Sequence, residues 1–92
     1  MVIKEIDGVA VNFTGEYYTV IIKQHDAPGV AAYITACFAN HAVNIAFMRI
    51  YRDNKGEQAY TVVETDEAHS PGLIEQLKKG TNILSVRPII PV

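Results

Sequence analysis

The fold is decided by the stretch YYTVIIKQHDAPGVAAYITACF at residues 17–38, in which the spacing of apolar residues changes half-way. Residues 17–24 are mostly β-branched or aromatic, which is typical of a strand buried on both faces. Asp26 and Pro28 then form a helix-start signature, because a carboxylate caps free N–H groups and proline loses no hydrogen bond in the first turn. The pattern predicts a helix from about Pro28 to Asn40. The residues that follow the junction share one helical face, at Val30, Tyr33, Ile34, Cys37, Phe38 and His41.

The next segments predict a β-hairpin. Residues 43–52 and 57–65 are two further strand patterns, and the turn sequence at residues 53–56 joins them. A turn of this length allows only antiparallel pairing.

The C-terminal part repeats the helix and strand signals. Ser70-Pro71 again combines a capping side chain with proline, and it predicts a short helix that stops at Gly80. Residues 82–90 predict the last strand, and Pro88 places that strand at a sheet edge because proline cannot donate to a ladder.

From residue 16 on, the order is therefore β-α-β-β-α-β, which is the ferredoxin-like α+β arrangement with a four-stranded antiparallel sheet. Right-handed crossovers place both helices on one face and leave the other face bare in a single chain. Such a bare apolar face predicts self-association. Across the sheet the strands are expected in the order 82–90, 17–24, 57–65 and 43–52.

A separate short hairpin is predicted ahead of this unit. Residues 2–13 alternate around Asp7-Gly8, a pair that suits a two-residue turn. We therefore divide the chain into an N-terminal hairpin and linker at residues 1–15 and one domain at residues 16–92.

Composition excludes several classes of protein. The 92 residues are 49% hydrophobic and 20% charged, which is typical of a globular domain. The net charge of −2 provides no basic surface for nucleic acid or for an anionic membrane. The chain opens with no signal peptide, and no apolar run reaches the ~20 residues that span a bilayer. A cytoplasmic protein without nucleic-acid or membrane partners is expected.

Catalytic and metal-binding motifs are not found in the sequence. His25, His41 and His69 have no metal-ligand spacing, so they are interpreted as structural or solvated residues. Cys37 is the single cysteine and lies on the apolar helical face, where a buried core residue is expected. No catalytic residue and no metal ligand is therefore assigned.

One group of polar residues suggests a ligand site. The segment from Gln24 to Gly29 and the residue Asn44 are expected at the same end of the molecule. Helix N-terminal N–H groups at Gly29 and Val30 favour a carboxylate, and Asp26 provides an anion for an ammonium group. Together these groups would bind both ends of an α-amino acid. The alternative is that Asp26 only caps the helix and Asn44 only caps a strand.

The pattern Asp-x-Pro-Gly-Val followed by Val-Asn-Ile-Ala-x-Met-Arg resembles the ACT domain, a small-molecule sensing module that works as a dimer or a higher assembly. The segments EIDGVAVNFTGEY, HDAPGV, NIAFMRIYRDNKG and YTVVETD are most similar to the C-terminal ACT domain of the β subunit of the bacterial iron–sulfur L-serine dehydratase. The resemblance implies an amino acid bound between two chains. Carried over by position, it implies the ligand-binding residues Gln24, Asp26, Gly29, Val30 and Asn44. Related serine-sensing domains often have Asn at the position of Asp26.

The resemblance also implies how the chain is used. It would be a regulatory domain that senses L-serine or another small amino acid, forms a homodimer and joins the catalytic α subunit or region of the dehydratase. The [4Fe–4S] cluster would belong to that catalytic part, and this chain would hold no cofactor. Two alternatives remain at this point: a structural dimerisation module with an empty pocket, and an acylphosphatase-like enzyme, which lacks the arginine expected in its phosphate loop.

Overall fold

The computed structural model of the chain describes residues 2–6, 9–13, 17–52 and 57–89. The predicted turns at residues 7–8 and 53–56 lie outside these ranges. The elements in chain order are β1 (Val2–Ile6), β2 (Val9–Phe13), β3 (Tyr18–His25), α1 (Val30–Asn40), β4 (Ile45–Arg52), β5 (Gln58–Thr65), α2 (Pro71–Lys78) and β6 (Ile83–Ile89).

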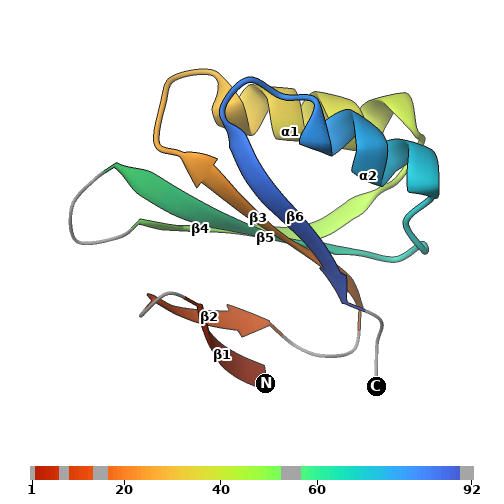
Figure 1. Ribbon diagram of the computed structural model, residues 1–92. Helices are drawn as coiled ribbons and strands as arrows, with labels where there is room; N and C mark the ends of the chain where they lie inside the picture. The colour runs from red at the N-terminus through yellow and green to blue at the C-terminus, as the bar shows by residue number, and fades with distance from the viewer. Residues whose placement is uncertain (1, 7–8, 14–16, 53–56, 90–92) are drawn as a thin grey trace.

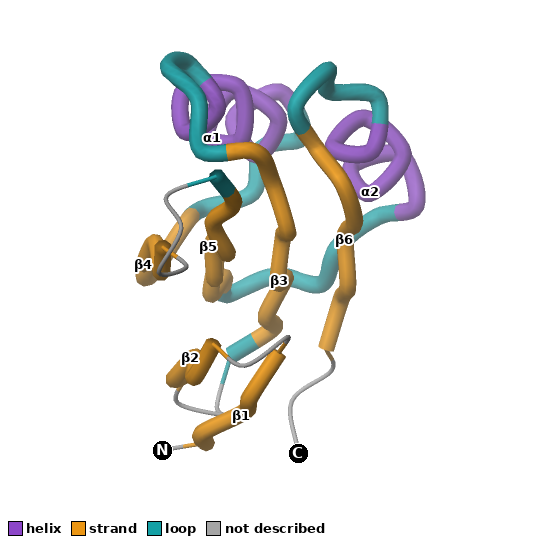
Figure 2. Tube along the Cα trace, turned by 60° about the vertical axis from the view of Figure 1, so that its left-hand side comes forward, coloured by secondary structure: helices purple, strands orange, loops and turns teal. Residues whose placement is uncertain are grey.

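The main sheet has four strands in the order β4-β5-β3-β6 (Figure 2), and every neighbouring pair is antiparallel. This confirms the predicted strand order and the ferredoxin-like fold. The central strands β3 and β5 are the most buried, because both of their faces are covered. β6 lies at one edge, as Pro88 requires, and β4 lies at the other.

Both helices cover the same face of this sheet (Figure 1), and the main core lies between the helices and the strands. The side chains that alternate toward the helices from β3 and β5 meet the apolar faces of α1 and α2. Cys37 is 1% exposed in this core, so its predicted burial is confirmed. The core consists of Val20, Ile22, Val30, Ile34, Cys37, Phe38, Val63, Leu73 and Leu77.

The opposite face of the sheet is not bare, contrary to the prediction. β1 and β2 pair as an antiparallel hairpin, and the hairpin lies against this face in both views (Figures 1 and 2). Val11 of β2 is fully buried and packs with Ile21, Tyr60 and Val62 of the sheet. The apolar surface that was expected to require a second chain is thus covered partly by the N-terminal residues of the same chain. The assignment of residues 1–15 and 16–92 as separate units stays a prediction.

The two helices begin differently. α2 begins as predicted, because the Ser70 hydroxyl accepts a hydrogen bond from the Leu73 N–H at 3.2 Å and Pro71 is the first helical residue. α1 begins at Val30, two residues later than predicted, and no side chain caps it. Among the described residues, neither helix is long and apolar enough to cross a membrane.

Candidate functional site

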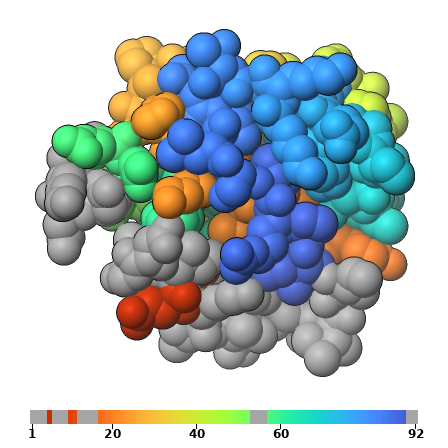
Figure 3. All heavy atoms as spheres, in the orientation of Figure 1, coloured from red at the N-terminus to blue at the C-terminus, as the bar shows by residue number. Residues whose placement is uncertain are grey.

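The junction between β3 and α1 is held from both sides. The His25 N–H donates to the Asn82 carbonyl at 2.9 Å, and the Asp26 N–H donates to the Glu57 carbonyl at 3.0 Å. The first bond ties the junction to the loop before β6, and the second ties it to the start of β5. Figure 3 shows the loop before β6, in blue, against the orange segment that ends β3. The backbone at the start of α1 therefore has a defined position.

The N-terminus of α1 is open to a ligand. Gly29 is the N-cap residue and has φ +84°, a left-handed conformation that glycine adopts without a steric penalty. The first helical N–H groups have no intrahelical acceptor, and they carry a partial positive charge. No side chain caps them here and no acidic residue lies in the first turn. The Val30 N–H donates a long hydrogen bond, 3.4 Å, to the Ala27 carbonyl. A carboxylate of a bound molecule would be a stronger acceptor for the N–H groups of this turn.

The expected capping by Asp26 is wrong. Its Oδ2 lies 3.0 Å from the Nε of Arg52, at the end of β4. The Asp26 side chain is 26% exposed and the Arg52 side chain 70% exposed, so the pair lies at the surface beside the junction. The carboxylate faces the neighbouring strand end because β4 and β3 both end near the same part of β5.

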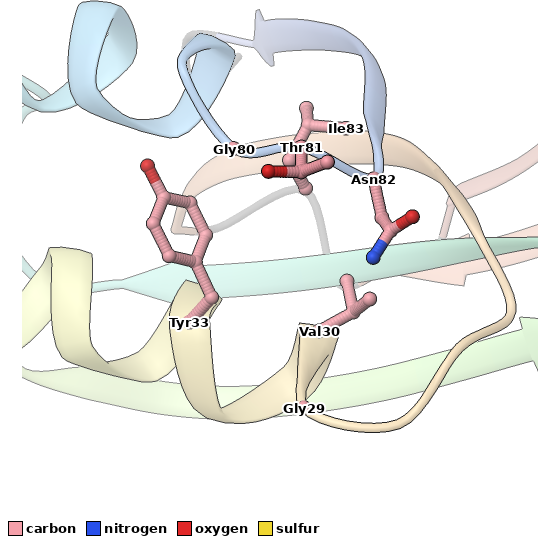
Figure 4. Close-up of a pocket in the computed structure, with 7 residues that line it drawn as sticks. All are labelled: Gly29, Val30, Tyr33, Gly80, Thr81, Asn82 and Ile83. Carbon is pink, nitrogen blue, oxygen red and sulfur yellow. The ribbon is translucent and has the colours of Figure 1, made fainter.

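A cavity of about 150 Å³ opens beside the N-terminus of α1. It lies between the first turn of the helix and the loop that follows α2 (Figure 4), where the Asn82 side chain reaches toward Val30. Gly80 is needed in this wall, because a Cβ at that position would lie 2.7 Å from atoms of Tyr33 and Ile83. The lining residues are Gly29, Val30, Tyr33, Gly80, Thr81, Asn82 and Ile83.

The hydroxyl of Tyr33 is already engaged on one side of this cavity. It donates a hydrogen bond to the Gln76 carbonyl of α2, which joins the two helices. Burial is the main cause that raises the pKa of Tyr33, and a side-chain hydrogen bond with Cys37 adds to it. Tyr33 is therefore neutral at physiological pH, and it lines the cavity without contributing a charge.

Gln24, which the resemblance implies as a ligand-binding residue, lies beneath the junction, and its contact with a ligand stays a prediction. Its side chain is 3% exposed, and its Oε1 accepts a hydrogen bond from the Thr61 hydroxyl at 2.5 Å. This hydrogen bond satisfies the buried Gln24 side-chain oxygen between the sheet and the helices. It connects β3 to β5 just before the junction.

Asn44 does not lie near the other predicted ligand residues of the same chain. Ile45 at the start of β4 pairs with Thr65, whereas Arg52 pairs with Ala59, the residue opposite Gln24. At ~3.3 Å per residue, Asn44 and Arg52 are about 25 Å apart. The expectation of a common end is wrong, because α1 carries the chain back across the sheet before β4 begins.

At its own end of the sheet, Asn44 binds two carboxylates. Its backbone N–H donates to Glu67 Oε2 at 3.0 Å, and its side-chain amide donates to Asp66 Oδ2 at 3.4 Å. Asn44 is exposed there. The sequence interpretation also missed Arg52 and Asn82. Arg52 was detectable, since the expected strand order places the end of 43–52 at the same end of the sheet as the end of 17–24, with 57–65 between them.

Metal chemistry finds no support in the described part of the chain, which contains no group of three or more His, Cys, Asp or Glu side chains in position to hold an ion. His41 lies 2.9 Å from the Gln76 side chain and His69 lies 2.8 Å from the Thr65 hydroxyl. Both distances join a ring nitrogen to an oxygen atom, and both fit structural roles.

An open helix N-terminus, a small cavity and an exposed Asp–Arg pair thus occur together on a ferredoxin-like fold. The sequence pattern of the ACT domain matches residues 18–79, which include α1, the junction before it and the β-hairpin after it. The chain belongs to the ACT domain family. It is a regulatory domain, and this family assignment agrees with the strand order and with the resemblance noted in the sequence.

Relatives of this ACT domain occur in two kinds of enzyme. D-3-phosphoglycerate dehydrogenase of Methanocaldococcus jannaschii is 32% identical over 88 residues, which are 96% of this chain and 17% of that protein. The probable L-serine dehydratase β chain of Bacillus subtilis is 24% identical over 87 residues, which are 95% of this chain and 40% of that protein. The ACT domain thus spans less than half the length of these relatives.

Solved structures show the same fold. The ACT domain of GTP pyrophosphokinase from Chlorobium tepidum superposes with a TM-score of 0.64 at 16% identity, covering 80% of this chain and 97% of that one. The C-terminal domain of the MgtC protein from Mycobacterium tuberculosis gives a TM-score of 0.60 at 16% identity, covering 86% and 92%.

Proposed function

We propose that this ACT domain is the L-serine-sensing regulatory domain of an iron–sulfur L-serine dehydratase. The observation that carries the proposal is the uncapped N-terminus of α1, which opens on a small cavity between the first turn of the helix and the loop before β6. The similarity to a dehydratase β chain supports the choice of parent enzyme.

The ligand is a small amino acid in this proposal. Its carboxylate binds the N–H groups at Gly29 and Val30, where the helix dipole is positive. Its ammonium group binds Asp26, in competition with Arg52. A cavity of about 150 Å³ is small beside the ~300–1,000 Å³ of drug-sized sites, so a short side chain such as that of serine fits best. Asn82, on the cavity wall, is placed to bind the serine hydroxyl.

The site is completed by a second chain in this proposal. Asn44 is too far from Asp26 to share a ligand within one chain, so it acts from the neighbouring chain of a homodimer. Catalysis belongs to the α subunit or region of the dehydratase, which holds the [4Fe–4S] cluster. The present residues do not fit such a cluster, because the sequence has one cysteine where four thiolates are usual, and that cysteine is buried.

Calorimetric titration of the chain with each of the twenty amino acids tests the proposal. L-serine should bind, and the substitution Asp26→Asn should weaken binding about 10- to 100-fold, since a charged hydrogen bond contributes roughly 1.5–3 kcal/mol. Stability should change by less than about 1 kcal/mol, because the carboxylate forms a surface ion pair and does not cap the helix. Glu75→Gln, which changes an exposed carboxylate on α2, is the matched control and should leave the Kd unchanged.

If the unsubstituted chain and Asp26→Asn bind L-serine with equal affinity, the assignment of Asp26 to the ligand site is wrong. If no amino acid binds, the chain is instead a structural dimerisation module.

A second parent enzyme is favoured by one observation, the 32% identity to an archaeal D-3-phosphoglycerate dehydrogenase. The two candidate enzymes, the dehydratase and the dehydrogenase, differ in the catalytic part to which this domain should bind. Size-exclusion chromatography of this chain with an iron–sulfur dehydratase α subunit should give a complex, whereas a complex with the catalytic part of the dehydrogenase would favour the second parent.

A further inference from the structure

Two residues, Tyr33 and Gly80, form one wall of the cavity beside α1. Tyr33 lies about one turn after Val30 on the helix, and Gly80 lies in the loop between α2 and β6. The Tyr33 ring and the Asn82 side chain lie on opposite sides of the cavity (Figure 4). The wall formed by the ring therefore lies opposite the residue that is proposed to bind the serine hydroxyl.

The Tyr33 ring is held in this position at its far end. Its hydroxyl donates to the Gln76 carbonyl in the last turn of α2. The ring also packs against the main core, as does the neighbouring side chain of Ile83. Moving the ring away would break a hydrogen bond that joins the two helices and would leave a carbonyl with one partner fewer. The wall is therefore stiff.

Gly80 gives the ring the space that it occupies. A Cβ at position 80 would lie 2.7 Å from Tyr33 Cε2 and 2.7 Å from Ile83 Cγ1, whereas carbon atoms pack at about 3.5–4.0 Å. The loop is fixed on both sides of this residue, because the Gly80 N–H donates to the Leu77 carbonyl at 3.3 Å and the Ile83 N–H donates to the Gly80 carbonyl at 3.1 Å. A side chain at this position would therefore displace Tyr33 or Ile83, and both of these residues line the cavity.

We propose that Tyr33 sets the upper size limit for the side chain of the bound amino acid, and that Gly80 maintains this limit by leaving room for the ring. The inference rests on the proposed function, which supplies the ligand and its orientation. With the ligand hydroxyl at Asn82, a further group on the Cβ of the ligand points away from Asn82, and the Tyr33 ring lies on that side. The cavity of about 150 Å³ leaves little space there.

L-threonine measures this limit, because it is L-serine with one additional methyl group on Cβ. Both amino acids have the same ammonium, carboxylate and hydroxyl groups, so the polar contacts of the proposed site are the same for both. One carbon too many in a fitted pocket weakens binding about 10- to 200-fold. The Kd for L-threonine should therefore exceed the Kd for L-serine by about that factor.

Calorimetric titration of the full chain with both amino acids tests the inference through the ratio of the two Kd values. Tyr33→Ala removes the ring, so L-threonine should then bind about as tightly as L-serine. Tyr33→Phe keeps the ring against Gly80 and should keep the ratio of the unsubstituted chain. Thr35→Ala, at an exposed position on the same helix, is the control and should also keep the ratio. If Tyr33 only packed the helices together, its truncation would lower stability and leave the ratio unchanged.

The substitution Gly80→Ala tests the part of the inference that concerns the loop. The added Cβ must displace the Tyr33 ring or the Ile83 side chain, so the Kd for L-serine should rise by about tenfold or more. In a Tyr33→Ala background one of the two collisions is absent, and the same change should raise the Kd less. Circular dichroism checks that each variant is folded. An unchanged Kd for L-serine in Gly80→Ala would overturn the role given to Gly80.

The outcomes separate this inference from the proposed function. If the unsubstituted chain binds no amino acid, the proposed function is wrong and the size limit is wrong with it. If the chain binds L-serine, but Tyr33→Ala discriminates against L-threonine as strongly as the unsubstituted chain does, the proposed function stands and the inference is wrong. Equal binding of both amino acids by the unsubstituted chain also overturns the inference. Should Tyr33→Ala fail to fold, Tyr33→Leu, which keeps an apolar contact with the core, replaces it with the same expected loss of discrimination.

Discussion

His69 shows how the position of one side chain determines its chemistry. The imidazole lies edge-on to the rings of Tyr18 and Phe38, with centroid distances of 6.1 and 6.0 Å. A ring nitrogen lies 2.8 Å from the Thr65 hydroxyl. Burial in these surroundings lowers the pKa of the His69 imidazole. The folded protein therefore favours the neutral ring.

The lowered pKa of His69 predicts a loss of stability in acid. Above the ordinary histidine pKa of about 6.5, the ring is neutral in both states and its full contribution to stability is present. As the pH falls below that value, the unfolded chain takes up the proton first, so the free energy of unfolding decreases until the folded pKa is passed. Urea denaturation between pH 7.5 and pH 5 measures this slope. His69→Gln should flatten it, because it removes the group whose pKa is lowered by burial.

At the scale of elements, the two ends of α1 are made by backbone rather than by side chains. The helix begins at a left-handed glycine without a cap. It ends in a Schellman-type turn, in which the Ala42 N–H donates to the Ala39 carbonyl and the Val43 N–H donates to the Phe38 carbonyl, both at 3.0 Å. Ala42 has φ +55°, a conformation that alanine adopts at a cost. Helix α2, in contrast, begins with a side-chain cap at Ser70.

The substitution Ala42→Gly should stabilise the protein. Glycine removes the left-handed strain of ~1–2 kcal/mol but adds freedom to the unfolded chain, so the expected net gain in the free energy of unfolding is about 0.5–1 kcal/mol. Ala39→Gly, in the last turn of α1, is the matched change in the right-handed helix and should cost about 1 kcal/mol. Thermal denaturation of both variants compares them. A loss of stability in Ala42→Gly equal to that in Ala39→Gly would contradict the role given to the turn.

At the scale of the whole molecule, three layers share the sheet. The helices cover one face, and the N-terminal hairpin covers part of the other. The hairpin adds a second apolar cluster, with Val11 at its centre. Among the residues whose burial the structure describes, the large apolar side chains that stay exposed are Phe47, Ile50 and Leu84, on the two edge strands of the sheet. The hairpin thus reduces, without removing, the apolar surface that this sheet face would offer to a second chain.

Placing a charge beneath the hairpin should release it from the sheet. Val11→Asp replaces a fully buried side chain, and the lost burial alone should lower the free energy of unfolding by about 2 kcal/mol or more. The uncovered Ile21 and Val62 should also bind a hydrophobic dye such as ANS. Ala10→Asp, at the exposed neighbouring position on the same strand, is the control. Equal stability of the two variants would show that the hairpin does not protect this face.

The sequence by itself determined the order of strands and helices, the antiparallel sheet, the edge position of β6, the burial of Cys37 and the cap of α2. Each of these follows from local signals: apolar periodicity, a capping serine, or a proline that cannot donate to a ladder. The start of α1 was predicted two residues too early: Gly29 has a left-handed backbone, and the Asp26 carboxylate pairs with the distant Arg52 instead of capping the helix.

Only the tertiary structure decided which polar groups meet. It paired Asp26 with Arg52, buried Gln24 against Thr61 and moved Asn44 to the opposite end of the sheet from Asp26. It also laid the hairpin of Val11 on the sheet face that was expected to be bare. The physical reason is that local signals depend on neighbours along the chain, whereas these contacts depend on strand direction and register. Those are determined when segments far apart in sequence pack together.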